Sequence, residues 1–183
     1  MKNNVTKQIV TLISGMLLLT LMGCQGGAVK PLAAVPQVDL PRFMGDWYVI
    51  ANIPTFIETG AHNAIESYKQ DADGTIAVTF TFRDGAFDGK LKQYTPRGFV
   101  RDTQSNAIWG MQFIWPIKTD YRITYLAPDY SQTIISREQR DYVWIMARTP
   151  GIPDADYQRL ANLVRDQGYD ITRLQKVPQQ WKK

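Results

Sequence analysis

Residues 76–83 read Ile-Ala-Val-Thr-Phe-Thr-Phe-Arg, with a large apolar side chain at every second position. Successive side chains of a β-strand point to opposite faces of its sheet, so this period of two predicts a strand with one buried face. Turn-forming residues bound the stretch, Asp71-Ala72-Asp73-Gly74 before it and Asp84-Gly85 after it. The segment therefore predicts one strand of an antiparallel sheet.

Similar stretches recur along the chain from Gly45 onward and are joined by short connections. Residues 102–106 and 127–131 are rich in turn-forming Asp, Asn, Ser and Pro. Many short strands at close spacing are typical of an antiparallel barrel or sandwich, without an internal repeat or a second domain. The eight expected strands cover residues 47–56, 63–70, 76–83, 89–101, 107–115, 121–127, 132–136 and 141–148.

One amphipathic helix follows these strands. Pro153 and Asp154 suit its start, and Gly168 suits a left-handed cap at its end. Its single apolar stripe indicates that it lies against the outside of a closed sheet. Residues 171–174 are expected to add a short strand. The stripe comprises Tyr157, Leu160, Ala161 and Val164.

The N-terminus has the order of charges and apolar residues found in a secretory signal. Lys2 and Lys7 precede the nearly all-apolar residues 9–22, a stretch shorter than the roughly 20 residues that cross a bilayer core of about 30 Å. Cys24, the only cysteine of the chain, follows directly. This arrangement resembles the lipobox of bacterial lipoproteins, although Met22 stands where a small residue is usual. An ordinary signal with a cysteine nearby by chance is the alternative.

The lipobox resemblance implies cleavage before Cys24 and acylation of its thiol and amine, as with palmitate. By the same resemblance, Gln25 indicates the outer rather than the inner membrane, and more than one acyl chain gives durable anchoring. The expected organisation is a signal peptide at 1–23, an acylated cysteine with a flexible, Gly- and Pro-rich tether at 24–41, and a barrel domain at 42–183.

The bulk charge gives no sign of a nucleic-acid partner. Loss of Lys2 and Lys7 with the signal lowers the formal net charge from +4 to +2, and no stretch holds five consecutive basic residues. With Cys24 acylated, no thiol remains for a disulfide, so packing alone must hold the exported domain together.

Three motifs, taken together, resemble those of lipocalins, in particular the bacterial outer-membrane lipocalins of the apolipoprotein D-like group. They are Gly45-Asp46-Trp47-Tyr48, Thr119-Asp120-Tyr121 and Arg148-Thr149-Pro150. Their order fits the strand pattern and the helix over residues 42–183. The resemblance implies an all-β fold, an eight-stranded antiparallel up-and-down barrel with one C-terminal α-helix packed outside.

The same resemblance implies structural roles at the closed end of the barrel. Gly45 would begin the barrel, and Trp47 would plug its base. Arg148 would pack over the indole of Trp47 in a cation–π contact, with Tyr121 nearby.

An eight-stranded barrel has room for one small ligand, and side-chain parity indicates which residues face it. If Trp47 and Arg148 point inward, residues of the same parity also point inward. The parity extends to Ile53, Phe82 and Trp115, where a bulge would reverse it. The expected cavity residues are Val49, Ala51, Ile76, Val78, Phe80, Trp109, Met111, Phe113, Tyr142, Trp144 and Met146.

Such an apolar lining suits an acyl chain, since each buried methylene contributes about 0.8 kcal/mol. The resemblance implies fatty acids or lysophospholipids as ligands, in a protein used for lipid storage, transport or membrane maintenance. A headgroup would stay near the open rim, where the candidate groups are Glu58, His62, Arg83 and Lys118.

The sequence offers little for catalysis. His62 is the only histidine, and no Gly-x-Ser-x-Gly element accompanies it. A zinc or haem site would need more ligands, so we expect no enzyme activity, metal or cofactor. The alternatives to lipid binding are a scaffold lipoprotein with a filled barrel and a carrier of another hydrophobic small molecule. Aromatic residues such as Tyr48 and Tyr125 would suit a homodimer.

Overall fold

Residues 76–84 form strand β3 (Ile76–Asp84), and their alternation matches their burial. Ile76, Val78, Phe80 and Phe82 are all buried, while the residues between them are partly exposed. The computed structural model describes residues 30–181 of the chain. The predicted signal peptide, Cys24 and Gln25 lie outside these described residues.

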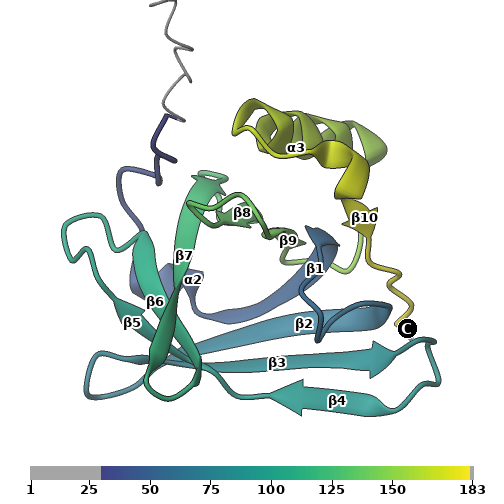
Figure 1. The fold of residues 1–183 in the computed structure, drawn as a ribbon, viewed down its shortest axis with the longest axis horizontal. Coiled ribbons are helices and arrows are strands. Elements are labelled where there is room, and N and C mark those ends of the chain that lie inside the picture. Colours follow the sequence, from purple (N-terminus) through teal and green to yellow (C-terminus); the bar gives the residue numbers. More distant parts are fainter. Residues whose placement is uncertain (1–29, 182–183) are drawn as a thin grey trace, which may run out of the picture. The chain divides into compact units, whose positions relative to one another are not determined.

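The strands form a closed antiparallel barrel (Figure 1). Successive strands of the chain pair with each other, apart from β4 and β5, which both pair with β3, and β9 pairs with β1 to close the sheet. The predicted eight-stranded barrel is thereby confirmed. The strands are β1 (Gly45–Ile53), β2 (Ala61–Gln70), β3, β4 (Leu91–Tyr94), β5 (Arg97–Val100), β6 (Ile108–Ile114), β7 (Ile117–Leu126), β8 (Gln132–Ser136) and β9 (Val143–Ala147).

The stretch predicted as one strand at 89–101 is divided into β4 and β5, and both halves pair with β3. Pro96 lies at the break. Proline has no N–H to donate to a neighbouring strand, so it interrupts the ladder at this point. The two halves together fill one strand position of the barrel.

Helix α3 (Asp154–Asp166) lies outside the barrel, as predicted (Figure 1). Its buried residues Leu160 and Val164 pack against Ile50, Ile134 and Ile145 on β1, β8 and β9. The prediction of an extra strand at 171–174 is wrong in position. A 3-10 turn, η1 (Ile171–Arg173), occupies that stretch, and the short strand β10 (Gln175–Lys176) follows and pairs with β1.

The aromatic residues considered for a dimer contact are engaged by the chain itself. Tyr48 makes an edge-to-face contact with Trp181 at 5.5 Å between ring centroids. Arg159 of α3 donates a hydrogen bond to the Tyr125 hydroxyl at 2.9 Å. These two rings are therefore covered at least in part by the C-terminal segment.

Residues 31–41, within the described part of the expected tether, contact the barrel. Leu32 and Val38 are buried, and the Val35 N–H donates to the Ile123 carbonyl at 2.9 Å. Apolar side chains of these residues pack against the barrel. The Gly and Pro content of the segment did not predict this packing. Helix α2 (Leu40–Phe43) then leads into β1.

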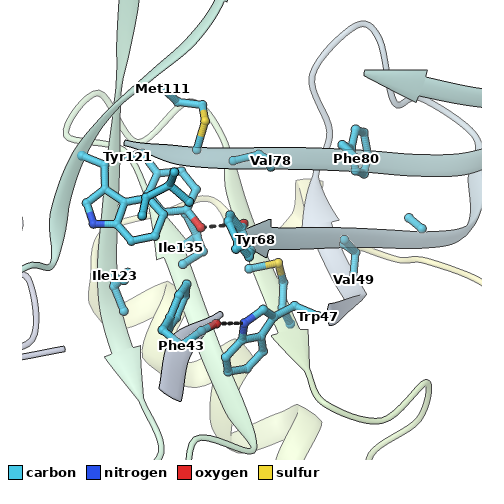
Figure 2. Close-up of a cluster of buried hydrophobic side chains, with 14 of the residues drawn as sticks. Phe43, Trp47, Val49, Tyr68, Val78, Phe80, Met111, Tyr121, Ile123 and Ile135 are labelled. Atoms are coloured by element: carbon cyan, nitrogen blue, oxygen red, sulfur yellow. Dashed lines mark hydrogen bonds between the residues drawn. The ribbon is translucent and has the colours of Figure 1, made fainter. Parts of the chain in front are cut away.

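One end of the barrel is closed by aromatic packing (Figure 2). The Trp47 indole is fully buried, lies 5.0 Å from the Phe43 ring and donates a hydrogen bond to the Phe43 carbonyl. The Arg148 guanidinium covers the outer side of that indole, 3.8 Å from the ring centroid. Trp109 and Tyr121 stack above this group at 5.1 Å.

Among the described residues, the hydrogen bonds and core contacts of the barrel join residues within 31–181. A chain that begins at Gln25 therefore retains the whole barrel. Within the described range, no helix is both long enough and apolar enough to cross a membrane.

Candidate functional site

A cavity of about 340 Å³ occupies the barrel above the closed end. Strands β2, β3, β4, β6, β7 and β9 supply its wall, together with the β1–β2 and β8–β9 connections. These connections lie at the opposite end from Trp47, so the cavity belongs to the open end of the barrel. Ligand pockets in proteins start at about this volume.

Six of the eleven side chains expected at the cavity are in its wall. They alternate along their strands, and most are aromatic or long and apolar. The six are Val78, Phe80, Met111, Phe113, Tyr142 and Trp144.

Four other expected residues point into the barrel but lie in solid packing rather than at the cavity. Val49, Ile76, Trp109 and Met146 are fully buried in the core cluster that contains Trp47. Large rings from Phe43, Tyr68 and Tyr121 fill the space around them. The lower half of the barrel is thus filled, and only the upper half is hollow.

Ala51 differs from its expected orientation. The β1–β9 register shifts between Val49 and Ala51, which marks a bulge. The extra residue reverses the side-chain parity beyond it. Ala51 and Ile53 therefore lie in the cluster beneath α3 and not at the cavity.

The parity prediction also fails at the end of β6. A register shift between Met111 and Ile114 precedes the β6–β7 turn, and Trp115 is 83% exposed there. On β3 the alternation holds through Phe82, which is buried in the core cluster and stacks on Tyr94, but Phe82 does not line the cavity.

Glu66 is the most informative cavity residue that the sequence did not reveal. It pairs with Trp47 across β1 and β2, so both side chains point into the barrel. The Tyr68 hydroxyl donates to its carboxylate, and Tyr68 is also linked to the Tyr121 hydroxyl at 2.7 Å. Burial raises the pKa of Glu66 to about 7, and the charge of Glu58 adds to that rise.

Glu58, expected at the exposed rim, is instead buried in the cavity wall. Its carboxylate accepts hydrogen bonds from the Thr55 N–H at 2.8 Å and from the Trp144 indole N–H at 3.1 Å. Burial raises the pKa of this carboxyl, which outweighs the lowering effect of its hydrogen bonds.

The other three groups expected at the rim do not line the cavity. The His62 ring packs edge-to-face on Phe87 at 4.9 Å. Arg83 donates to the Gly89 carbonyl at 3.3 Å, and the Lys118 ammonium lies 3.4 Å from the Phe99 ring centroid.

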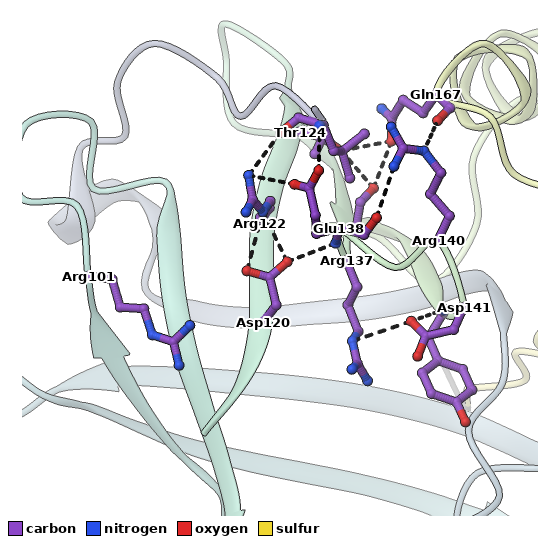
Figure 3. A network of polar contacts seen from close by, with 12 residues as sticks. Arg101, Asp120, Arg122, Thr124, Arg137, Glu138, Arg140, Asp141 and Gln167 are labelled. Carbon is purple, nitrogen blue, oxygen red and sulfur yellow. Dashed lines mark hydrogen bonds and ion pairs between the residues drawn. The ribbon is translucent and has the colours of Figure 1, made fainter. Parts of the chain in front are cut away.

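Arg137 is the one cationic side chain among the described residues that line the cavity. Its Nε lies 3.4 Å from the Asp141 carboxylate (Figure 3). Asp120, also at the cavity wall, pairs with Arg122 at 3.0 Å. Both of these charges therefore already have a partner of opposite sign.

The site has the chemistry of a binding pocket. Apolar and aromatic walls surround a small number of polar groups, which is the usual composition of a small-molecule site. Across residues 30–181, no group of three or more His, Cys, Asp or Glu residues is placed to hold a metal ion.

Comparison with known proteins identifies the family. The model of the lipocalin-like domain matches residues 38–179. This chain belongs to the lipocalin family. Membership places it among proteins that typically bind small hydrophobic ligands and are not enzymes.

Lipocalin relatives come from several kingdoms. Temperature-induced lipocalin-1 of Arabidopsis thaliana is 30% identical, covering 82% of this chain and 84% of its own. The outer membrane lipoprotein Blc of Escherichia coli K12 is 25% identical over 79% of this chain and 81% of its own. Apolipoprotein D of Mus musculus is 26% identical over 74% of each chain.

Solved structures agree on the lipocalin fold. Insecticyanin of the tobacco hornworm Manduca sexta superposes with a TM-score of 0.65, covering 86% of this chain and 88% of its own. At 14% identity, this likeness concerns the fold alone.

Proposed function

We propose that this lipocalin is an outer-membrane lipoprotein that holds the chain of a single-chain lipid, a fatty acid or a lysophospholipid, in its barrel cavity. Lipid storage, transport or membrane maintenance would all use this binding step. The observation that carries the proposal is the apolar, aromatic wall of the cavity, with side chains such as Phe80, Met111 and Trp144.

The energetics favour a chain over a compact polar ligand. Each methylene transferred from water into such a cavity contributes about 0.8 kcal/mol, so several methylenes give useful affinity without polar recognition. Few polar groups line the wall. Two of them are the carboxyls of Glu58 and Glu66, and burial disfavours the ionised form of both. We infer binding rather than catalysis from the same composition.

The open end of the barrel suits exchange of lipid with a membrane. Phe56, Ile114, Trp115 and Ile117 are each more than half exposed, in the β1–β2 connection and around the β6–β7 turn at that end. Phe56 and Ile114 also line the cavity. A lipid chain could pass between a bilayer and the cavity along these side chains while keeping contact with apolar surface.

The predicted anchor is compatible with that orientation. Leu32 contacts Glu138 and Arg122, so the chain enters the barrel domain beside the β8–β9 connection. A segment as long as Cys24–Pro31 reaches at most about 25 Å. The β7 segment from Arg122 back to Ile117 spans about 17 Å. An acylated Cys24 would thus be able to share a bilayer with the exposed residues of the open end.

A filled scaffold barrel is the second candidate, and the solid lower half around Trp109 is the observation in its favour. The two candidates differ in lipid uptake.

The test uses residues 25–183, delipidated, titrated with a lysophospholipid and with a long-chain fatty acid while tryptophan fluorescence is followed. We expect saturation near one lipid per barrel and a smaller signal in Trp144→Phe, since this indole lines the cavity. Absence of any response to both lipids would favour the scaffold or a carrier of a different ligand.

A further inference from the structure

We propose that the cavity receives the ammonium group of an amphiphile between Glu58 and Glu66, and that it selects cationic or zwitterionic amphiphiles over purely anionic ones. This inference rests on the proposed function, because it names the charge class of the ligand that the same cavity holds.

The charges around the cavity are unevenly matched. Asp120 is paired with Arg122, and Arg137 is paired with Asp141. Among the described residues, Glu58 and Glu66 form no ion pair with a cation. The cavity therefore holds two carboxyls without a cationic partner, and a fatty acid placed beside them would add another acidic group without one.

Both carboxyls face the place where a ligand would lie. Glu66 is enclosed by the barrel, yet its side chain is among those that line the hollow space. Its described hydrogen-bond donor is the Tyr68 hydroxyl, whereas an ionised carboxylate can accept about four hydrogen bonds. Glu58 approaches the cavity from the β1–β2 connection, held by Thr55 and Trp144.

The aromatic walls add to the attraction for a cation. Tyr94, Tyr142 and Trp144 line the cavity together with the two carboxyls. The face of an aromatic ring attracts an ammonium group within about 6 Å of its centroid. A carboxylate ligand would gain nothing from these ring faces.

Ionisation of Glu66 links this preference to pH. Tyr68 on β2 donates to Glu66 and is linked to Tyr121 on β7, and the charge of Glu58 on the β1–β2 connection acts on Glu66. Arg137 on the β8–β9 connection lines the same cavity. Burial and the nearby Glu58 raise the pKa of Glu66 to about 7. A cation bound beside it should lower this pKa, so binding should release a proton. Cation affinity should rise between about pH 6 and pH 8, while the affinity for a neutral chain stays constant.

The experiment compares three ligands with the same chain: dodecyltrimethylammonium, dodecanol and dodecanoate, below their micelle-forming concentrations. Residues 25–183 are titrated by calorimetry at pH 6 and pH 8, in buffers of different ionisation enthalpy to count released protons. At pH 8 we expect the cation to bind about ten-fold more tightly than the alcohol, the effect of one close charge pair, and dodecanoate to bind most weakly. Proton release should accompany the cation alone.

Glu66→Gln keeps the shape of the side chain and removes the charge, so it should reduce the cation's advantage while alcohol binding persists. Asp166→Asn on the outer face of α3 removes an exposed carboxylate paired with Arg165, and it should leave the ligand order unchanged. Equal affinity for all three ligands, or tightest binding of dodecanoate, would overturn the inference and leave the proposed function standing. Failure of every ligand to bind would overturn both.

Discussion

The guanidinium of Arg148 lies 3.8 Å from the centroid of the Trp47 ring and donates hydrogen bonds to four main-chain carbonyls around the start of β1. One side chain at the end of β9 therefore fixes both the indole that closes the barrel and the segment that leads into it. The pair thus holds the closed end together with the aromatic packing and the hydrogen bond from the Trp47 indole to the Phe43 carbonyl.

Arg148→Ala should destabilise the barrel by about 2 to 4 kcal/mol, since it removes a cation–π contact and leaves several carbonyls without a donor. Urea unfolding of residues 25–183 measures the loss. Arg165→Ala removes an arginine whose side chain is 55% exposed and should change stability by less than about 0.5 kcal/mol. Similar losses in both variants would contradict the role given to Arg148.

Met111 and Met146 form a matched pair that tests where the barrel becomes hollow. Met146 is fully buried in solid packing, so Met146→Ala should cost about 2 to 5 kcal/mol through the void it creates. Met111 already borders the cavity, so Met111→Ala should cost less than about 2 kcal/mol.

The two methionine variants should also differ in lipid binding. Met111→Ala enlarges the cavity and should shift the preferred fatty acid to a longer chain, which competition between chains of different length would detect. Met146→Ala should leave that preference unchanged. A shift in both variants would mean that the cavity extends to the base.

Sequence parity succeeds where the strands are regular. Val78 and Phe80 lie on β3, whose pairing with β2 is continuous at these positions, and both face the cavity as the alternation predicts. On β1 the bulge after Val49 turns Ala51 toward α3. A bulge depends on how two strands pair, so the sequence of one strand alone does not predict it.

The polar residues of the site could be identified only from the register between strands. In the sequence, Glu66 is one charged residue of a predicted half-exposed strand. Only its pairing with Trp47 shows that its side chain points into the barrel. Likewise, parity alone cannot separate Trp109 in the filled base from Met111 in the wall, because filling depends on the rings of Phe43, Tyr68 and Tyr121.

Stability should fall as pH rises, because burial raises the pKa of Glu66 from its ordinary value of 4.5 to about 7. Between these two values the folded state binds the proton that the unfolded state has lost, so ionisation favours unfolding. The full effect is up to about 3 kcal/mol, reached above pH 7. Glu58 acts in the same direction.

Urea unfolding at intervals from pH 4 to pH 8 checks this dependence. Glu66→Gln should show a smaller decrease over the range and should exceed the natural chain in stability at pH 8. Identical pH profiles for the two proteins would show that Glu66 ionises at the same pH in the folded and unfolded states.

Trp115 provides a test of the open end as the surface that meets lipid. It is 83% exposed at the β6–β7 turn, where it adds little to packing, so Trp115→Ser should change stability by less than about 0.5 kcal/mol. The loss of an exposed indole should nevertheless slow transfer of a fluorescent fatty acid from residues 25–183 to phospholipid vesicles.

Equilibrium affinity for the same fatty acid should stay unchanged in Trp115→Ser, because Trp115 does not line the cavity. Trp181→Ser is the matched control, since Trp181 is also exposed, at 41%, but packs beside Tyr48 away from the open end. Equal transfer rates in all three proteins would mean that lipid leaves the cavity through water, and the exposed residues of the open end would then have no part in the exchange.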